Sequence, residues 1–96
     1  MSTVERDDFE WDDAKADANV VKHGVTFEEA CTVFEDLDYL LNVDPVDPER
    51  FIAVGLSNVA RVLVVVHGVR GERTRIISAR RATVFEERLY AQRSER

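Results

Sequence analysis

The spacing of apolar residues changes near residue 39 of this 96-residue chain. Before that point, apolar positions recur at helical intervals and define one face of a predicted helix: Phe27, Ala30, Cys31, Val33, Phe34 and Leu37. After it, short apolar runs such as RFIAVGLS (50–57) and RVLVVVHGVR (61–70) are typical of strands, and the second is apolar enough for burial on both faces. The first half is therefore predicted to be mainly helical and the second half mainly a sheet.

Capping signals indicate where the N-terminal helices begin and end. A short strand, FEW (9–11), precedes a helix in DDAKADANVVKHG (12–24), which an aspartate can cap and which Gly24 can end in a left-handed conformation. The stretch TFEE (26–29) has capping-box spacing and predicts the start of a second helix.

The remaining segments predict a sheet followed by a last helix. Strands are expected at YLLNV (39–43), 50–57, 61–70 and RTRIISAR (73–80), with a tight GE turn (71–72) before the last of them. RATVFEERLYAQRSER (81–96) then reads as a helix, in which Thr83 and Glu86 have capping-box spacing.

The resulting order is β-α-α-β-β-β-β-α, an α+β fold in which two N-terminal helices pack on a four-stranded antiparallel sheet with a C-terminal helix. No repeat or linker divides the chain, so residues 1–96 are predicted to form a single domain, frayed at 1–8 and 91–96.

Composition narrows the class of protein. With 45% hydrophobic and 33% charged residues, the chain is typical of a globular protein, and no apolar run reaches membrane-spanning length. The N-terminus has no apolar signal region, and a lone cysteine, Cys31, cannot form an internal disulfide. We therefore expect a cytoplasmic location and no membrane partner.

Charge is divided unevenly along the chain. Residues 1–49 hold 15 acidic and three basic side chains, a net −12, whereas residues 50–96 hold four acidic side chains and ten arginines, a net +6. Arginine can bind phosphate or carboxylate through two parallel hydrogen bonds, so a half-chain with arginine as its only cation suggests oxyanion recognition. The alternative is that these arginines pair with the acidic half of the same chain.

The hairpin formed by 61–70 and 73–80 predicts which side chains meet. A turn centred near Arg70 and Gly71 places Arg61 opposite Arg80, with His67 opposite Thr74. Like charges opposite each other in a sheet are destabilising, so the arginines need an anion between them. Glu86 is the internal candidate and an RNA phosphodiester is the functional one.

The C-terminal helix supplies further candidate groups. Glu86 and Tyr90 lie four residues apart and share one helical face. A carboxylate, a phenol and nearby arginines are groups that RNA cleavage without a metal ion requires. The ordinary structural interpretation is that Glu86 caps the helix, Tyr90 packs over the edge of the sheet, and the arginines form surface ion pairs.

The two histidines also have two interpretations each. His23, next to Lys22, either interacts with the end of its helix or takes part in proton transfer and phosphate binding. His67 at the end of an apolar strand is either half-buried or a proton acceptor. The histidines and the cysteine lack metal-ligand spacing, and the glycines form no phosphate loop, so no metal and no cofactor are expected.

Several stretches together resemble the BrnT family of bacterial toxins: FEWDDAKADANVVKHGVTFEEACTVFED (9–36), VGLS (54–57), RVLVVVHGVRGERTRIISARRAT (61–83), and the later Glu86 and Tyr90. The resemblance implies a RelE-like α+β fold and a ribonuclease toxin of a type II toxin–antitoxin system. It also implies a BrnA-type antitoxin partner with a ribbon-helix-helix DNA-binding domain, which neutralises the toxin and represses the shared operon. The polar residues that match the family are Lys22, His23, Arg61, Arg80, Arg81, Glu86 and Tyr90.

The predicted function is metal-independent RNA cleavage that inhibits translation and growth. Arg61, Arg80 and Arg81 would hold the scissile phosphate, with Lys22 and Arg70 adding positive charge. Glu86 or His67 would accept a proton, and His23 or Tyr90 would donate one. The partners are RNA and the antitoxin, DNA is reached only through the antitoxin, and a homodimer within the complex is left open.

The alternative is a catalytically weak or inactive antitoxin-binding module that acts in autorepression. Val69, where the family often has glutamate, favours this alternative, as do the arginine-poor last helix and the acidic half. One basic concavity containing Arg61, Arg80 and Arg81 would support the nuclease, whereas arginines engaged in internal ion pairs would support the module.

Overall fold

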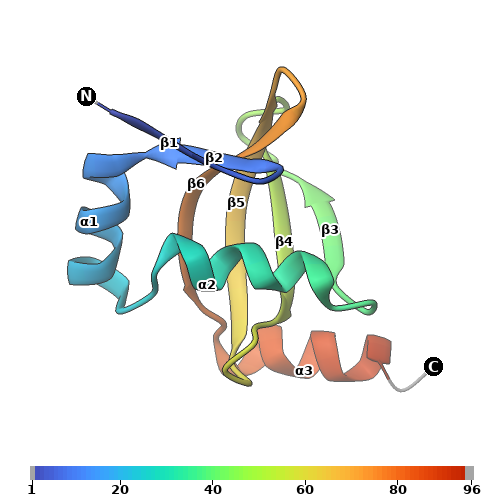
Figure 1. Ribbon diagram of the computed structural model, residues 1–96. Coiled ribbons are helices and arrows are strands. Elements are labelled where there is room, and N and C mark those ends of the chain that lie inside the picture. Colours follow the sequence, from blue (N-terminus) through green and yellow to red (C-terminus); the bar gives the residue numbers. More distant parts are fainter. Residues whose placement is uncertain (1, 95–96) are drawn as a thin grey trace.

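The computed structural model describes residues 2–94 and shows a mixed sheet with helices around it (Figure 1). The elements follow in the order β1 (Thr3–Arg6), β2 (Phe9–Asp12), α1 (Asp13–His23), α2 (Phe27–Thr32), a short 3-10 turn η1 (Val33–Glu35), β3 (Leu40–Val43), β4 (Phe51–Leu56), β5 (Val62–Arg70), β6 (Arg73–Arg81) and α3 (Val84–Ser94).

The α+β class is confirmed, but the predicted four-stranded antiparallel sheet is wrong. The sheet has six strands in the order β1-β2-β6-β5-β4-β3. The strands β3 to β6 form the predicted antiparallel meander, whereas β2 runs parallel to β6, with Phe9 opposite Thr74. Strand β2 adds to the edge of the meander because α1 and α2 carry the chain across one face of the sheet before β3 begins.

Strand β1 lies in a segment that we expected to be frayed. It forms an antiparallel hairpin with β2, and Asp7 in the connecting turn has a positive φ of 56°. The sequence TVER lacks a clear apolar alternation, and the backbone pairing with β2 explains the strand instead. At the other terminus α3 continues to Ser94, and the predicted fraying of residue 1 and of residues 95–96 lies outside the described residues.

The register of the β5–β6 hairpin also differs from the prediction. Arg70 pairs with Arg73 across the GE turn, and a bulge between Val66 and His67 shifts the rest of the ladder. Arg80 therefore lies opposite Val64 and His67 lies opposite Ile76. The predicted Arg61–Arg80 cross-strand pair is wrong, because Arg61 precedes β5.

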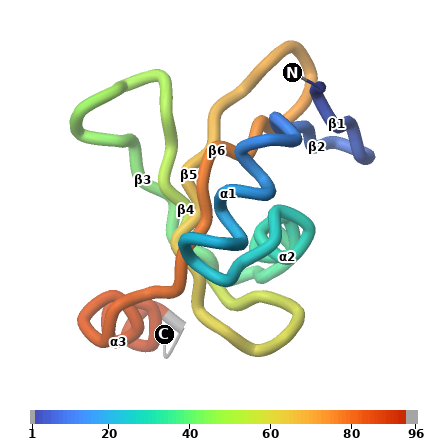
Figure 2. Tube along the Cα trace, turned by 90° about the vertical axis from the view of Figure 1, so that its left-hand side faces the viewer, coloured from blue at the N-terminus to red at the C-terminus, as the bar shows by residue number. Residues whose placement is uncertain are grey.

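The core lies between the sheet and the two N-terminal helices. Trp11 and Phe27 meet edge to face with ring centroids 6.0 Å apart, and both are almost fully buried. The other buried apolar side chains of this cluster are Val25, Ala30, Val33, Ala53, Leu63, Val65, Ile76 and Ala79. Figure 2 shows α1 and α2 on this side of the sheet and α3 on the other side, at one end.

The predicted helix caps are present. Asp12 accepts a hydrogen bond from the Lys15 backbone N–H (3.0 Å), and Thr26 accepts one from Glu29 (3.0 Å). Gly24 ends α1 with φ of 67°. None of the helices within residues 2–94 is long and apolar enough to cross a membrane.

Asn19 joins α1 to the strand that carries the adjacent arginines. Its buried amide donates to the carbonyls of Val25 and Ala79 (2.8 Å each) and accepts from the Ala79 backbone N–H (3.1 Å). A buried amide with all these bonds made strongly favours one alignment of helix and strand. It fixes the end of α1 beside the end of β6.

Candidate active site

The predicted polar residues gather mainly at one end of the sheet, where β4 and β6 end and β5 begins. This end also receives the C-terminus of α1, one side of α2 and the start of α3 (Figure 1). We define the strand-end cluster as Glu29, Arg61, Arg80, Arg81 and Glu86. Its side chains come from three different parts of the sequence, which the fold brings to one edge.

Arg61 is bound on the α2 side of the sheet. Its Nε donates to Oε2 of Glu29 (3.1 Å), its Nη2 donates to Oε1 of the same carboxylate, and Nη2 also reaches the Gly24 carbonyl (3.3 Å). The Ser57 hydroxyl donates to Oε2 as well (2.7 Å). Hydrogen bonding from Arg61 is the main reason that the pKa of Glu29 lies below its usual value. Glu29 therefore stays ionised and holds the first residue before β5 against α2.

Arg80 is bound on the other side, by the first turn of α3. Its Nη1 and Nη2 donate to the two carboxylate oxygens of Glu86 at 2.8 and 2.9 Å. The Thr83 N–H donates to Oε1 of Glu86 (2.8 Å), and the Glu86 N–H donates to the Thr83 hydroxyl (3.2 Å), which completes the predicted capping box. Arg80, above all, lowers the pKa of Glu86 to about 2.

Arg81 differs from its neighbours because, within the described part of the chain, no hydrogen bond or ion pair holds its exposed side chain. Successive side chains of a strand point to opposite faces, so Arg80 faces α3 and Arg81 faces the side of α1 and α2. The charge of Arg81 contributes to the lowered pKa of Glu29. Arg81 and Arg61 therefore lie near the same carboxylate.

Lys22 and His23 form the last turn of α1, directly before the Gly24 carbonyl that Arg61 binds. Lys22 is exposed and His23 is partly exposed. The fold thus brings the Arg61 guanidinium to the end of the helix that carries this lysine and this partly exposed histidine.

Tyr90 is anchored to a residue that the sequence analysis did not select. Its hydroxyl donates to Oδ2 of Asp36 (2.5 Å), and the same oxygen accepts the Leu56 backbone N–H (2.9 Å). Burial, followed by the bond to Asp36, raises the pKa of Tyr90 to about 12, so the phenol stays protonated. The close approach of Asp36 also requires Gly55, because a Cβ at Gly55 would lie 3.2 Å from Oδ2 and 2.8 Å from Tyr39 and Val33.

Two predicted site residues lie elsewhere. His67 is buried against the rings of Phe34 and Phe51, at centroid distances of 4.8 and 5.8 Å, and burial lowers its pKa. Arg70 ends β5 at the hairpin tip, eight residues along the strand from Val62, which is about 26 Å in extended backbone. The fold separates both residues from the strand-end cluster.

The sequence analysis did not select two carboxylates that lie in the site, Glu29 and Asp36. Glu29 is the last residue of the TFEE capping box and Asp36 follows η1, so each has a local structural explanation in the sequence. Only the packing of α2 against the start of β5 brings Glu29 to Arg61. Within residues 2–94 no group of three or more histidine, cysteine, aspartate or glutamate side chains is placed to hold a metal ion.

The comparisons with known proteins place the chain in a class, the ribonuclease toxins of type II toxin–antitoxin systems. The family model described as the ribonuclease toxin BrnT of type II toxin–antitoxin systems matches residues 11–86, so the chain belongs to the BrnT family. The class implies an RNA substrate and a cognate antitoxin, and the family is one of endoribonucleases.

A solved structure supports the same assignment. The 1.1 Å crystal structure of the Brucella abortus ribonuclease toxin BrnT is similar to this chain with a TM-score of 0.63 and 29% sequence identity. The similarity covers 76% of this chain and 92% of that chain. A comparison with curated protein sequences found no match. The ribonuclease interpretation of the sequence is therefore confirmed, although Arg61 and Arg80 are both engaged in the internal ion pairs that we took to favour a binding module.

Proposed function

We propose that this toxin cleaves RNA without a metal ion at the strand-end cluster and that Arg80 binds the scissile phosphate. The observation that carries the proposal is the two-nitrogen bond from Arg80 to Glu86. A phosphodiester presents two oxygens in the same arrangement as a carboxylate, so it can replace Glu86 on this guanidinium. Arg81 and Lys22, which have no carboxylate partner among the described residues, add charge for the neighbouring phosphates.

The exchange at Arg80 prepares Glu86 to act as a base. While Arg80 holds it, a carboxylate with a pKa of about 2 is a weak proton acceptor. Once phosphate takes the guanidinium, Glu86 loses the main interaction that lowers its pKa. The freed carboxylate then accepts the proton of the ribose 2′-hydroxyl.

The reaction follows from that proton transfer. The 2′-oxygen forms a bond to phosphorus, the bond from phosphorus to the 5′-oxygen breaks, and the products are a cyclic 2′,3′-phosphate and a 5′-hydroxyl. His23 or Tyr90 donates the proton that the 5′-oxygen needs. His23 ends α1, next in sequence to the Gly24 carbonyl that Arg61 binds, and Tyr90 lies one turn after Glu86, so their single variants His23→Gln and Tyr90→Phe separate the two possibilities.

The test is RNA cleavage by the purified chain in EDTA, with single variants Arg80→Ala, Arg81→Ala and Glu86→Gln. The matched control is Lys15→Ala, which removes one exposed lysine near the start of α1, away from the strand ends. We expect wild type and control to cleave, and Arg80→Ala and Glu86→Gln to lose about 100-fold or more. Cleavage that needs a divalent cation, or that survives in both variants, would contradict the proposal.

We also propose that the partner is a BrnA-like antitoxin with a ribbon-helix-helix domain, and that the toxin reaches DNA only through it. The net −12 of residues 1–49 supports this division, since an acidic surface repels nucleic acid. Toxin alone should not shift operator DNA in a gel, whereas the complex should shift it and should not cleave RNA. The cytoplasm, where both nucleic acids are present, is the expected location.

A further inference from the structure

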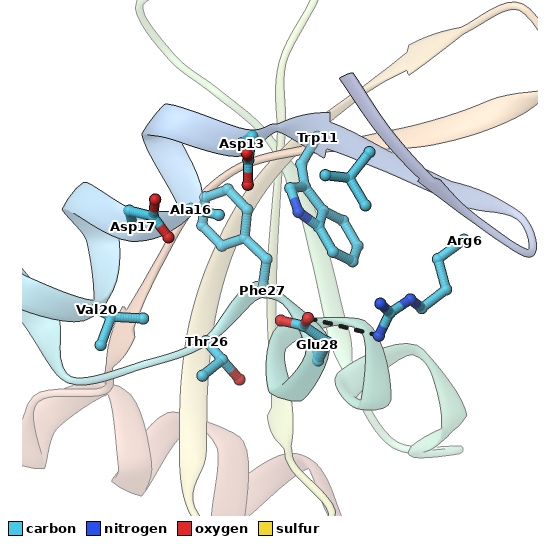
Figure 3. A pocket seen from close by; sticks show the side chains of 10 residues that line it. Arg6, Trp11, Asp13, Ala16, Asp17, Val20, Thr26, Phe27 and Glu28 are labelled. Atoms are coloured by element: carbon cyan, nitrogen blue, oxygen red, sulfur yellow. Dashed lines mark hydrogen bonds and ion pairs between the residues drawn. The ribbon is translucent and has the colours of Figure 1, made fainter. Parts of the chain in front are cut away.

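One cavity lies away from the strand-end cluster and shares no residue with it. It has a volume of about 310 Å³ and lies between the β1–β2 hairpin, α1 and the start of α2. Trp11 and Phe27 lie at its centre, with Val20 on one side (Figure 3). Val4 also lines it and adds apolar surface. A second cavity of about 210 Å³ adjoins it through Arg6, Trp11 and Glu28. Together we call them the acidic groove.

Arg6 separates the two cavities and is weakly held. Its guanidinium lies 5.8 Å from the Trp11 ring centroid and makes an ion pair of 3.5 Å with Glu28. The side chains of Arg6 and Glu28 are 58% and 52% exposed, so this pair contributes little stability. Arg6 therefore shows that a cation can sit over the Trp11 ring and beside the Glu28 carboxylate at the same time. Because its own contacts are weak, the Arg6 side chain can move out of this position at a small cost in free energy.

The remaining charges of the groove are acidic. Asp13 and Asp17 lie across the first cavity from Arg6 (Figure 3), and Asp7 and Glu35 line the second. The side chains of these four residues have no ion-pair partner among residues 2–94. Five carboxylates thus face one guanidinium, so the groove has unmatched negative charge around an apolar centre.

We propose that the acidic groove binds a basic segment of a protein partner, with an arginine or lysine of that segment placed over Trp11 between Glu28 and Asp17. The aliphatic part of such a side chain contacts Val4 and Val20, while its charge meets the carboxylates. An RNA strand is repelled by the same carboxylates. That the basic segment belongs to the antitoxin rests on the proposed function; the binding of a basic segment in the groove does not.

The test measures binding of a short fluorescent peptide of arginine, leucine and glutamine by anisotropy, beside a counterpart with glutamate in place of arginine. We expect the basic peptide alone to bind. The double variant Asp17→Asn, Glu28→Gln should weaken binding about tenfold. The matched control Glu49→Gln, Glu72→Gln removes two exposed carboxylates outside the groove and should leave binding unchanged.

Arg6 provides a second test with the opposite sign. If the chain's own guanidinium competes for the position over Trp11, Arg6→Gln should tighten peptide binding about threefold. Arg93→Gln, which also removes one positive charge, should not. Absence of peptide binding, or equal affinity in the groove variant and its control, would overturn the proposal. RNA cleavage by Asp17→Asn, Glu28→Gln should stay at the wild-type level, which separates this result from a failure of the active-site proposal.

Discussion

Protonation states in the site are set by single contacts between residues. Arg61 and Arg80 each hold one carboxylate, and these bonds lower the pKa values of Glu29 and Glu86. Despite the opposing effect of burial, hydrogen bonds from the Leu56 N–H and Tyr90 likewise lower the pKa of Asp36. The pKa of Tyr90, in contrast, is raised to about 12. At neutral pH the site therefore contains three ionised carboxylates and a protonated phenol, and only the removal of a partner changes this arrangement.

Glu86→Gln tests the ion pair to Arg80 through stability. Glutamine keeps an oxygen for the Thr83 N–H but carries no charge. The folded pKa of Glu86 lies below its unfolded value, so its stabilisation is present above about pH 4.5 and is lost as pH falls toward 2. We expect the variant to lose about 1–2 kcal/mol at pH 7, after allowance for solvent screening. Urea unfolding at several pH values should show the difference from wild type shrinking below pH 4.5; a constant difference would contradict the assignment.

His67→Phe tests whether the buried histidine belongs to the core. Burial lowers its folded pKa below 6.5, so the unfolded state binds the proton first and stability falls as pH drops below about 6.5. Phenylalanine between Phe34 and Phe51 removes this dependence. RNA cleavage should stay within about twofold of wild type, since His67 lies outside the strand-end cluster. If His67→Phe instead lost as much RNA cleavage as is expected for Glu86→Gln, His67 would have to take part in the reaction.

Sequence spacing predicted site contacts only where both partners were close in the chain. The Thr83–Glu86 cap follows from their three-residue spacing, and Glu86 was the internal candidate for Arg80. The partner of Arg61 is 32 residues away and depends on how α2 packs. The position of His67 depends on the bulge in β5–β6, which no local pattern indicated.

At the scale of elements, apolar patterning predicted the meander β3 to β6 and the helix α2, and capping signals predicted α1 and α3. The parallel pairing of β2 with β6 was not predicted, because it is made by backbone bonds between segments about 65 residues apart. Strand β1 was missed for a related reason. Three of its four side chains are exposed, so little hydrophobic signal distinguishes it from a loop.

Helix α3 is held differently from α1 and α2. Val84, Phe85 and Leu89 are 63%, 68% and 44% exposed, so little apolar surface of α3 is buried. Two polar side-chain contacts attach it to the rest of the fold, Arg80–Glu86 near its start and Asp36–Tyr90 in its second half. A helix fixed by two polar contacts opens more easily than one packed on a core.

Tyr90→Phe removes one of these two attachments. The hydroxyl bond to the ionised Asp36 is charge-assisted, so we expect a loss of about 1–2 kcal/mol. Hydrogen exchange of the α3 amides should accelerate more than that of β5. Gln92→Ala, an exposed position on the same helix, is the control and should leave exchange unchanged. Equal protection of α3 in wild type and Tyr90→Phe would show that Asp36 does not hold the helix.

At the scale of the whole molecule, opposite charges occupy different regions. The groove carboxylates without an ion-pair partner among residues 2–94 are Asp7, Asp13, Asp17 and Glu35, whereas Arg80 and Arg81 lie at the strand ends and Arg88 and Arg93 lie on α3. The net charge of −6 repels RNA at a distance, and local cations attract it at the site. Binding at this end must therefore depend on few phosphate contacts.

The salt dependence of RNA binding measures how many contacts there are. Each phosphate neutralised on a single strand contributes a slope of about −0.7 in log K against log salt concentration. If Lys22, Arg80 and Arg81 each contact one phosphate, the slope is about −2. Affinity for a 2′-O-methylated RNA, which binds without being cleaved, gives this slope by anisotropy. Arg81→Ala should reduce its magnitude by about 0.7, whereas Lys15→Ala should leave it unchanged. If Arg81→Ala does not alter the slope, Arg81 contacts no phosphate. RNA would then bind away from the end of β6 and closer to α3, where Arg88 and Arg93 are the remaining cations.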